Sequence, residues 1–322
     1  MFENFVKSHI GQRELNEDSY LVDESLGLYI VADGVGGHDK GEVASKLTCK
    51  IIQEGIKEGM SLVSAIESAH QVILSEISTE SNNKGMATTV VVIKFEQYDY
   101  EIAWVGDSRA YLWDGELKLL TRDHSYLELL FVAGHIEIDE FKDHPNKNVI
   151  SQAIGIDKKA ISVATNKGTL EKNQIILLAS DGLYEVAKED IIIQKLELDQ
   201  SVEKLTNDLV DCAENLDGKD NITLLSIKNN NEVVSENHIK AHVVRVFDPE
   251  TGKATELQED IINQTGNSQT KTKKKVISES IVPKDLSLSE LETKQRFRFK
   301  PLEMILVSLI FIALLVILNL KM

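Results

Sequence analysis

The chain repeats one construction three times: a short apolar run that ends in an aspartate. Runs of this length, rich in β-branched and aromatic residues, predict buried strands. A single Asp-Gly pair also forms ordinary turns, but the repetition favours several carboxylates placed at strand ends. The three ends are Asp33 after residues 28–32, Asp107 after residues 101–106 and Asp181 after residues 174–180.

Further acidic residues occur near both ends of this region, and they are Glu17, Asp18 and Asp220, with Arg13 close to the first two. Separated carboxylates without clustered His or Cys predict an oxygen-only site that suits magnesium or manganese and disfavours zinc. The glycines after Asp33, beginning with Gly34, let the backbone turn tightly and direct a main-chain carbonyl at a cation.

The histidines and cysteines predict no metal site. His124, His135 and His144 match no ligand spacing, so we expect them to pack or to lie in solvent. Cys49 and Cys212 lie in helix-like stretches, and we interpret them as buried apolar residues in a reducing compartment.

The charge balance restricts the partners. With 52 acidic and 35 basic residues and a formal net charge of −17, the chain would repel a polyphosphate, which argues against nucleic acid. It would also repel phosphorylated substrates at long range, so a site for phosphate needs local cations.

Eight short motifs follow one another in order between residues 13 and 221. They are RELNED, ADGVGGH, ATT at 87–89, VGDSRAYLWDG, LTRDHS at 120–125, SQAIG at 151–155, ASDGL, and DN at 220–221. This ordered set resembles the metal-dependent serine/threonine protein phosphatases of type 2C, in their bacterial form. The resemblance covers residues 1–228, which we therefore expect to form one catalytic domain.

The resemblance implies an α+β fold, a four-layer αββα sandwich of two mainly antiparallel sheets flanked by helices. Periodicity by itself predicts only the elements. Helices are expected over 41–56, 61–78, 126–133 and 201–215, and strands over 28–32, 87–95, 100–105, 110–113, 117–120 and 222–227.

The resemblance also implies the metal ligands, for two Mn²⁺ or Mg²⁺ ions and a third, weaker one. Asp33 would bridge two ions, with the Gly34 carbonyl on one of them and Asp181 and Asp220 on the other. Asp107, together with Asp181, would bind the third ion. These ions would activate a water for hydrolysis of phosphoserine and phosphothreonine in proteins.

Three residues are expected to serve catalysis beside the ions. Arg13 would bind two phosphoryl oxygens, Glu17 and Asp18 would hold metal-bound waters, and Asp18 would help to protonate the leaving group. Val35 follows Asp33 and Gly34, at the position where some animal relatives have a histidine proposed as general acid. The identity of the group that protonates the leaving alcohol therefore stays open. The segment 126–149, here called the flap, is expected to affect substrate choice.

The C-terminal third differs in composition. Residues 229–300 predict a polar flexible linker, with a small hairpin over 241–257. Residues 304–320 form a segment of 17 positions that is apolar apart from Ser308 and Asn319, which predicts a single transmembrane anchor. More basic residues precede this segment than follow it, so we expect a tail-anchored membrane protein with a cytoplasmic catalytic domain.

Two other functions remain open from the sequence. One is a catalytically weak relative that binds phosphoproteins, and it would lack a metal ligand. The other is a phosphatase for small-molecule or lipid phosphates. The preferred partners are phosphorylated proteins, a cognate Ser/Thr kinase that the phosphatase opposes, and the membrane.

Overall fold

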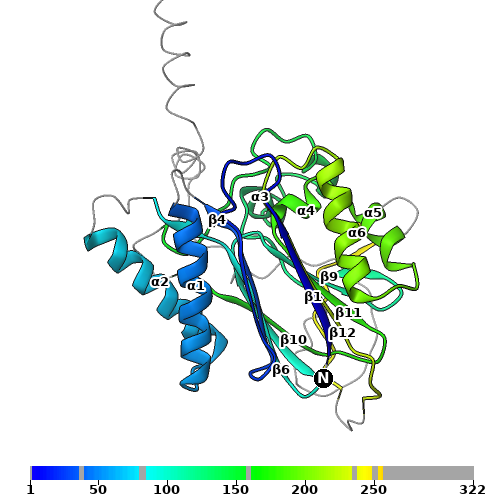
Figure 1. The fold of residues 1–322 in the computed structure, drawn as a ribbon. Helices are drawn as coiled ribbons and strands as arrows, with labels where there is room; N and C mark the ends of the chain where they lie inside the picture. Colours follow the sequence, from blue (N-terminus) through cyan, green and yellow to red (C-terminus); the bar gives the residue numbers. More distant parts are fainter. Residues whose placement is uncertain are drawn as a thin grey trace, which may run out of the picture. The chain divides into compact units, whose positions relative to one another are not determined.

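The computed structural model describes residues 2–35, 40–79, 85–156, 161–233, 238–248 and 253–256. Two antiparallel sheets lie face to face, and helices cover the outer face of each (Figure 1). The predicted membrane segment 304–320 and most of the predicted linker lie outside the described residues. Among the described residues, no helix combines the length and the apolarity that crossing a bilayer requires.

The first sheet has five strands in the order β10-β7-β6-β3-β2. Helices α1 and α2 cover its outer face because each buries a stripe of small and aliphatic residues spaced three or four apart, such as Ala65, Ala69 and Ile73 on α2. The elements are β2 (Ser19–Asp23), β3 (Leu28–Ala32), β6 (Val90–Glu96), β7 (Asp99–Val105), β10 (Ala164–Thr169), α1 (Lys40–Lys57) and α2 (Leu62–Thr79).

The second sheet has seven strands in the order β1-β12-β11-β8-β9-β13-β14. Helices α4, α5 and α6 pack on its outer face around a second apolar cluster. The elements are β1 (Glu3–His9), β8 (Arg109–Trp113), β9 (Leu117–Leu119), β11 (Ile175–Ala179), β12 (Ile222–Lys228), β13 (Arg245–Phe247), β14 (Ala254–Glu256), α4 (Asp181–Tyr184), α5 (Glu189–Leu196) and α6 (Val202–Asn215).

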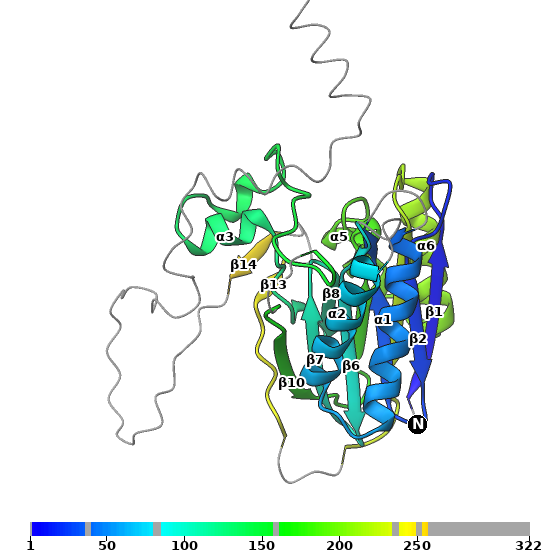
Figure 2. The same ribbon diagram turned by 90° about the vertical axis from the view of Figure 1, so that its left-hand side faces the viewer.

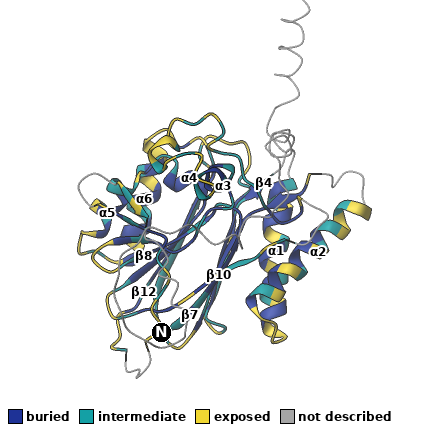
Figure 3. Cartoon of the chain, turned by 180° about the vertical axis from the view of Figure 1, so that it is seen from behind, coloured by how far each residue is buried: buried dark blue, intermediate teal, exposed yellow. Residues whose placement is uncertain are grey.

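A third apolar cluster fills the space between the two sheets, and it explains the unbroken apolar runs of the sequence. In β3, Leu28 and Ile30 face the helices, whereas Tyr29 and Val31 face the other sheet. Both faces of the strand are therefore buried, which removes the usual alternation of polar and apolar residues. Figure 3 shows the same distribution, with buried residues concentrated in the strands and on the inner sides of the helices.

Most predicted elements appear within one or two residues of their expected ends. The expected strand 87–95 is instead two strands, β5 (Ala87–Thr88) and β6, because the chain leaves the sheet at Thr89. β5 pairs with the short β4 (Gly34–Val35). The sequence pattern did not indicate β1, β2, β10 or α5. The flap begins with α3 (Tyr126–Val132) and also contains a short 3-10 helix, Ile138–Glu140.

The seven-stranded sheet continues beyond residue 228. β13 and β14 pair antiparallel within the region expected to form a hairpin, and β13 also pairs with β9, with Arg245 opposite Leu119. Residues 238–256, here called the C-terminal extension, thus contribute two strands to the sheet. Of the cysteines, Cys49 is buried, but Cys212 is partly exposed, contrary to our expectation.

Candidate active site

Four aspartates from separate parts of the chain converge on Asp33. Burial raises the pKa of Asp33 well above its usual range, and the negative charges of Asp181, Asp18, Asp107 and Asp220 raise it further, in that order. The aspartates predicted from strand ends therefore share one region. Carboxylates that raise each other's pKa in this way form an environment that favours a cation.

The donor set fits a hard divalent cation, although the ligands are not closed around one point. Among the described residues, no three Asp, Glu, His or Cys side chains already form a metal-binding group. Magnesium-type sites commonly use one or two carboxylates and complete the coordination with water, so they do not require three side chains. The side chain of Asp18 is only 7% exposed, and its Oδ1 has no hydrogen-bond partner among the described residues, as expected beside a bound cation or water.

Arg13 pairs with one of the predicted ligands. Its Nη2 donates to Asp220 Oδ2 over 2.6 Å. The Arg13 side chain is 50% exposed, so the guanidinium lies at the rim of the carboxylate cluster, where it can also meet a ligand from solvent. The position agrees with a phosphate-binding role, but here its partner is the Asp220 carboxylate.

Glu17 contacts the start of helix α1 rather than standing free in the cluster. Its Oε1 accepts a hydrogen bond from the Gly41 N–H over 3.1 Å, and its carbonyl accepts one from the Gly34 N–H, also over 3.1 Å. A carboxylate at a helix N-terminus is stabilised by the unpaired N–H groups and the helix dipole. Glu17 thus fixes the Gly34 turn against α1.

A hydrogen bond between Asp18 and Ser180 connects the two sheets, because Asp18 directly precedes β2 and Ser180 directly follows β11. Ser180 Oγ donates to Asp18 Oδ2 over 2.8 Å, and it also accepts from the Thr223 N–H over 2.9 Å. Burial raises the pKa of Asp18 to about 6, the charges of Asp220 and Glu17 act in the same direction, and hydrogen bonds from Thr223 and Ser180 oppose the rise. Asp18 can therefore carry a proton close to neutral pH.

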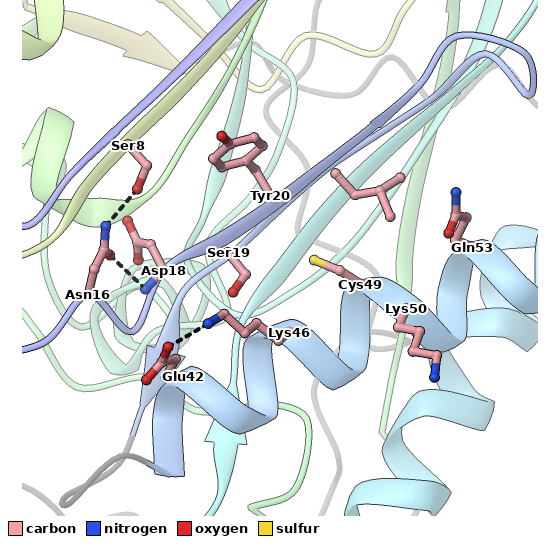
Figure 4. A pocket seen from close by; sticks show the side chains of 11 residues that line it. Ser8, Asn16, Asp18, Ser19, Tyr20, Glu42, Lys46, Cys49, Lys50 and Gln53 are labelled. Atoms are coloured by element: carbon pink, nitrogen blue, oxygen red, sulfur yellow. Dashed lines mark hydrogen bonds and ion pairs between the residues drawn. The ribbon is translucent and has the colours of Figure 1, made fainter.

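A cavity of about 480 Å³ lies beside Asp18, between the edge strand β2 and helix α1. Figure 4 shows Asp18 and Asn16 at one end of it and the α1 side chains of Lys46 and Lys50 along another side. Asn16 Oδ1 accepts from the Asp18 N–H over 3.1 Å, which orients the backbone at this point. The cavity leaves space for solvent next to the buried carboxyl.

Two threonines of the ATT motif fix the backbone of Asp33. The Asp33 carbonyl accepts from the Thr89 N–H and from the Thr88 hydroxyl, each over 2.8 Å. The Thr89 hydroxyl accepts a hydrogen bond from the Asp33 N–H over 3.2 Å. It also lies 2.7 Å from the hydroxyl of Ser108, the residue directly after Asp107. The turn that carries Asp33 and the turn that carries Asp107 are therefore linked, which accounts for the break between β5 and β6.

A buried cation supports the Asp107 turn from the other side. Tyr184 donates its hydroxyl hydrogen to the Asp107 carbonyl over 2.8 Å. Arg109 lies 3.8 Å from the centre of the Tyr184 ring and binds Asp123 through Nε and Nη2. This cation–π contact and bidentate ion pair hold Tyr184 in place.

Comparison with known proteins identifies the arrangement. A family model described as "Protein phosphatase 2C" matches residues 7–223. The chain belongs to the protein phosphatase 2C family. It is 32% identical to the serine/threonine phosphatase stp of Listeria innocua over 232 residues, which are 68% of this chain and 92% of that protein. It is 30% identical to the serine/threonine protein phosphatase PstP of Mycobacterium tuberculosis over 66% of this chain and 42% of that protein.

Solved structures agree with this membership. The crystal structure of the Mycobacterium tuberculosis phosphatase PstP/Ppp superposes with a TM-score of 0.66 at 28% identity, covering 71% of this chain and 99% of that one. Staphylococcus aureus Stp1 gives a TM-score of 0.65 at 28% identity, with 71% and 95% covered. The catalytic domain of PstP solved with two manganese ions gives 0.62 at 27% identity, with 70% and 97% covered.

In this 2C phosphatase, Asn221 has a structural role that its sequence pattern did not indicate. Its Nδ2 donates to the carbonyls of Ile10 and Leu15 over 2.8 and 2.9 Å, and its Oδ1 accepts from the Glu17 N–H over 2.8 Å. One side chain thereby holds the loop that carries Arg13. The DN motif already contained this residue, but only the preceding aspartate suggested chemistry.

His124 also has a role that its spacing could not show. The ring Nδ1 of His124 accepts a hydrogen bond from the Gly106 N–H over 3.2 Å. The backbone N–H of His124 donates to the Gly106 carbonyl over 2.9 Å. The ring stacks on Trp104 with an interplanar angle of 26°. Of the two roles expected for this histidine, packing and exposure to solvent, the structure shows packing.

Proposed function

We propose that this member of the protein phosphatase 2C family hydrolyses phosphoserine and phosphothreonine in proteins at a site that holds two manganese or magnesium ions. The observation that carries the proposal is the convergence of Asp18, Asp107, Asp181 and Asp220 on Asp33. The two manganese ions bound by the related PstP catalytic domain support it. Every metal ligand that the resemblance to the family implies is present in the chain.

The residues divide the task by position. Asp33, the Gly34 carbonyl, Asp181 and Asp220 would hold the two ions, and Asp107 would hold a third. When bound, the ions supply a water of lowered pKa and positive charge beside the phosphoryl group.

The remaining side chains bind and orient the substrate. Arg13, half-exposed at the rim, offers two N–H groups to phosphoryl oxygens and offsets their charge. Its contact with Asp220 must loosen, or be shared, when the substrate binds. Asp18, with a pKa raised to about 6, can hold a proton on its carboxyl and deliver it toward the leaving oxygen.

Release of phosphate from three substrates tests this function. A phosphothreonine peptide, a sugar phosphate and a short-chain lipid phosphate are each incubated with the full chain, with and without manganese. We expect manganese-dependent release mainly from the peptide, and loss of release in Asp181→Asn. Release only from the sugar or the lipid phosphate would contradict the proposed substrate class, and binding without release would indicate a phosphoprotein-binding relative.

Arg13→Lys separates phosphate binding from metal binding. Lysine keeps the positive charge but loses the planar fork. We expect KM for the phosphopeptide to rise while the manganese concentration that gives half-maximal activity stays the same. A change in the manganese requirement alone would contradict the assignment of Arg13 to the substrate.

We further propose that residues 304–320 anchor the phosphatase to a membrane, with the catalytic domain cytoplasmic and opposing a Ser/Thr kinase. The support is the 17-residue segment, in which all residues but Ser308 and Asn319 are apolar. It is preceded by Arg296, Arg298 and Lys300 and followed by Lys321. Because β14 ends at Glu256, 47 residues (257–303) separate the fold from the apolar run. A random chain of that length spans about 35–40 Å, which would concentrate the enzyme near membrane-bound substrates.

Flotation with lipid vesicles tests the anchor. The full chain should float with the vesicles and stay with them in high salt and at alkaline pH. A variant that ends at residue 300 should remain in the dense fraction. If both chains floated, or neither did, the membrane proposal would be refuted, but the phosphatase proposal would not be affected.

A further inference from the structure

The C-terminal extension runs from β10, an edge strand of the five-stranded sheet, to β9 of the seven-stranded sheet. It first pairs with β10, where the Thr169 N–H donates to the Ile239 carbonyl over 2.9 Å. Asn166 then donates to the His242 carbonyl over 2.7 Å and accepts from the His242 N–H over 3.1 Å. Finally β13 pairs with β9 of the other sheet. The extension lies beyond the matched family region, residues 7–223, yet it is an integral part of this fold.

Arg245 of the extension forms a buried ion pair with the flap. Its Nη2 donates to Glu128 Oε1 in the first turn of α3, and the two residues are only 4% and 3% exposed. Its guanidinium also lies 5.7 Å from the ring centre of Phe131 and 5.6 Å from that of Phe141. One side chain of the extension therefore contacts three residues of the flap, and Figure 2 shows β13 and β14 beside α3.

A second arginine completes the network. Arg122 Nη1 donates to Glu128 Oε2 over 3.0 Å, and its Nη2 donates to Glu256 of β14. Glu256 Oε2 also accepts from Arg245 Nε over 2.9 Å. Two arginines and two glutamates thus pair with one another. Arg245 and Glu128 are the buried members of this network and need such partners, whereas Arg122 and Glu256 are partly exposed.

Residues just before and just after the flap are hydrogen-bonded to turns of the metal site. At its entry, His124 pairs with Gly106, which directly precedes Asp107. After its exit, the Ile154 N–H donates to the Thr88 carbonyl over 2.9 Å, and Thr88 in turn donates to the Asp33 carbonyl. Hydrogen bonds on either side of the flap therefore hold it next to the metal site, and contacts of α3 hold it next to the C-terminal extension.

We propose that Arg245 is a positioning residue for the flap, and that the C-terminal extension thereby sets how this phosphatase receives the protein part of its substrate. The inference rests on the proposed function for its substrate. Arg13 and the ions held by the carboxylate cluster would bind the phosphate, whereas the contacts of Arg245 are with Glu128, Glu256, Phe131 and Phe141. A flap released from the extension lowers the affinity for a phosphopeptide, whereas a small ester that needs only the metal site is unaffected.

The test compares two variants of the full chain. Arg245→Met keeps most of the side-chain length but removes the charge, and Lys240→Met removes an exposed cation from the same extension as a matched control. We expect Arg245→Met to raise KM for a phosphothreonine peptide by about five-fold or more, with kcat and the kinetics on p-nitrophenyl phosphate unchanged. Arg245→Lys should restore part of the affinity. Lys240→Met should resemble the wild type.

Hydrogen exchange gives a readout that does not depend on activity. Amides of residues 126–149 should exchange on the order of ten-fold faster in Arg245→Met, while those of β6 and α2 keep the wild-type rate. Unchanged exchange in the flap, or an equal loss of activity on both substrates, would overturn the proposal. An inactive wild type would overturn the phosphatase function instead, and flap exchange would then decide the positioning role by itself.

A second variant covers the case in which Arg245→Met fails to fold. Glu128→Gln removes the same ion pair from the flap side and leaves Arg245 paired with Glu256. It should produce the same selective rise in peptide KM and the same faster exchange. A folded Glu128→Gln chain with wild-type KM and wild-type flap exchange would overturn the proposal.

Discussion

Gly34 and Gly41 are in backbone contact, at the point where helix α1 begins beside the turn that follows Asp33. A Cβ atom on Gly34 would lie 2.3 Å from the Gly41 carbonyl oxygen, and a Cβ atom on Gly41 would lie 2.5 Å from Glu17 Oε1. Side chains at either position are therefore excluded. The turn that carries the metal-site carbonyl is held at a fixed distance from the helix.

Gly41→Ala tests this contact. The added methyl group must displace the Glu17 carboxylate or the Gly34 turn, so we expect a loss of about 1–3 kcal/mol in unfolding free energy and a lower kcat/KM. Denaturant unfolding and phosphopeptide kinetics measure the two effects. Val43→Ala, at an exposed position of the same helix, should change neither by much. A fully active Gly41→Ala chain would show that the turn can shift without consequence.

Asp33→Asn should separate stability from function. The charged form of Asp33 is disfavoured by burial and by four neighbouring carboxylates, so a neutral amide should stabilise the metal-free protein by about 1–3 kcal/mol. The same change should abolish both the activity and the rise in Tm that manganese produces. Thermal unfolding in a chelator and in manganese chloride measures this, with Asp199→Asn as an exposed control. A lower Tm in the chelator would contradict the argument.

Asn221→Ala should disorder the loop that carries Arg13. Three hydrogen bonds are lost, two of them to partly buried carbonyls, so we expect a loss of about 2–4 kcal/mol in stability. Activity should fall further than stability explains, because Arg13 and Glu17 lose their fixed positions. The measurement is kcat/KM at a temperature where the variant is fully folded. Asn207→Ala, on the exposed side of α6, serves as the control.

The stability of the domain should fall in mild acid because of His124. Burial lowers the pKa of His124 to about 4 from its usual 6.5, so between these pH values the unfolded chain binds a proton that the folded chain does not. Stability is therefore retained above pH 6.5 and is lost as the pH falls toward 4, by at most about 3 kcal/mol. Protonation would also break the hydrogen bond that Nδ1 accepts from Gly106.

Urea unfolding of the wild type and of His124→Asn across this pH range measures the effect. Asparagine can accept the same hydrogen bond through Oδ1 but does not titrate. The difference in unfolding free energy between the two chains should change with pH between 4 and 6.5 and stay constant above 7. A pH-independent difference would assign the acid sensitivity to another group.

The sequence predicted the strand ends and the carboxylates well, for a physical reason. A strand buried on both faces, such as β3, leaves an unbroken apolar run, and the polar residue that ends it is easily recognised. The edge strands β1 and β2 were missed because their faces are only partly buried, so residues such as Lys7 and Tyr20 interrupt the pattern. The buried pairing of Arg245 with Glu128 was not predictable, because no local pattern relates residues so far apart in the chain.

The site itself was predicted only as a set of residue types. That Asp33 and Asp181 lie together follows from their strand ends, but the supports of Glu17 at Gly41 and of Asp18 at Ser180 depend on three-dimensional packing. The role of Asn221 is of the same kind. Its amide reaches carbonyls more than two hundred residues earlier, and a single sequence contains no signal for such a contact.

The segment from Ile10 to Asp18 leaves one sheet at its edge strand β1 and enters the other at its edge strand β2. Asp33 and Asp107 follow strands of the five-stranded sheet. Asp181 follows β11 and Asp220 precedes β12, and both of these strands are in the seven-stranded sheet. The reaction centre is thus divided between two halves whose alignment depends on the apolar layer sandwiched by them. Turnover should accordingly report on that distant layer: a cavity made there by shortening Leu225 would misalign the halves and slow the enzyme while every group that meets the substrate stays intact.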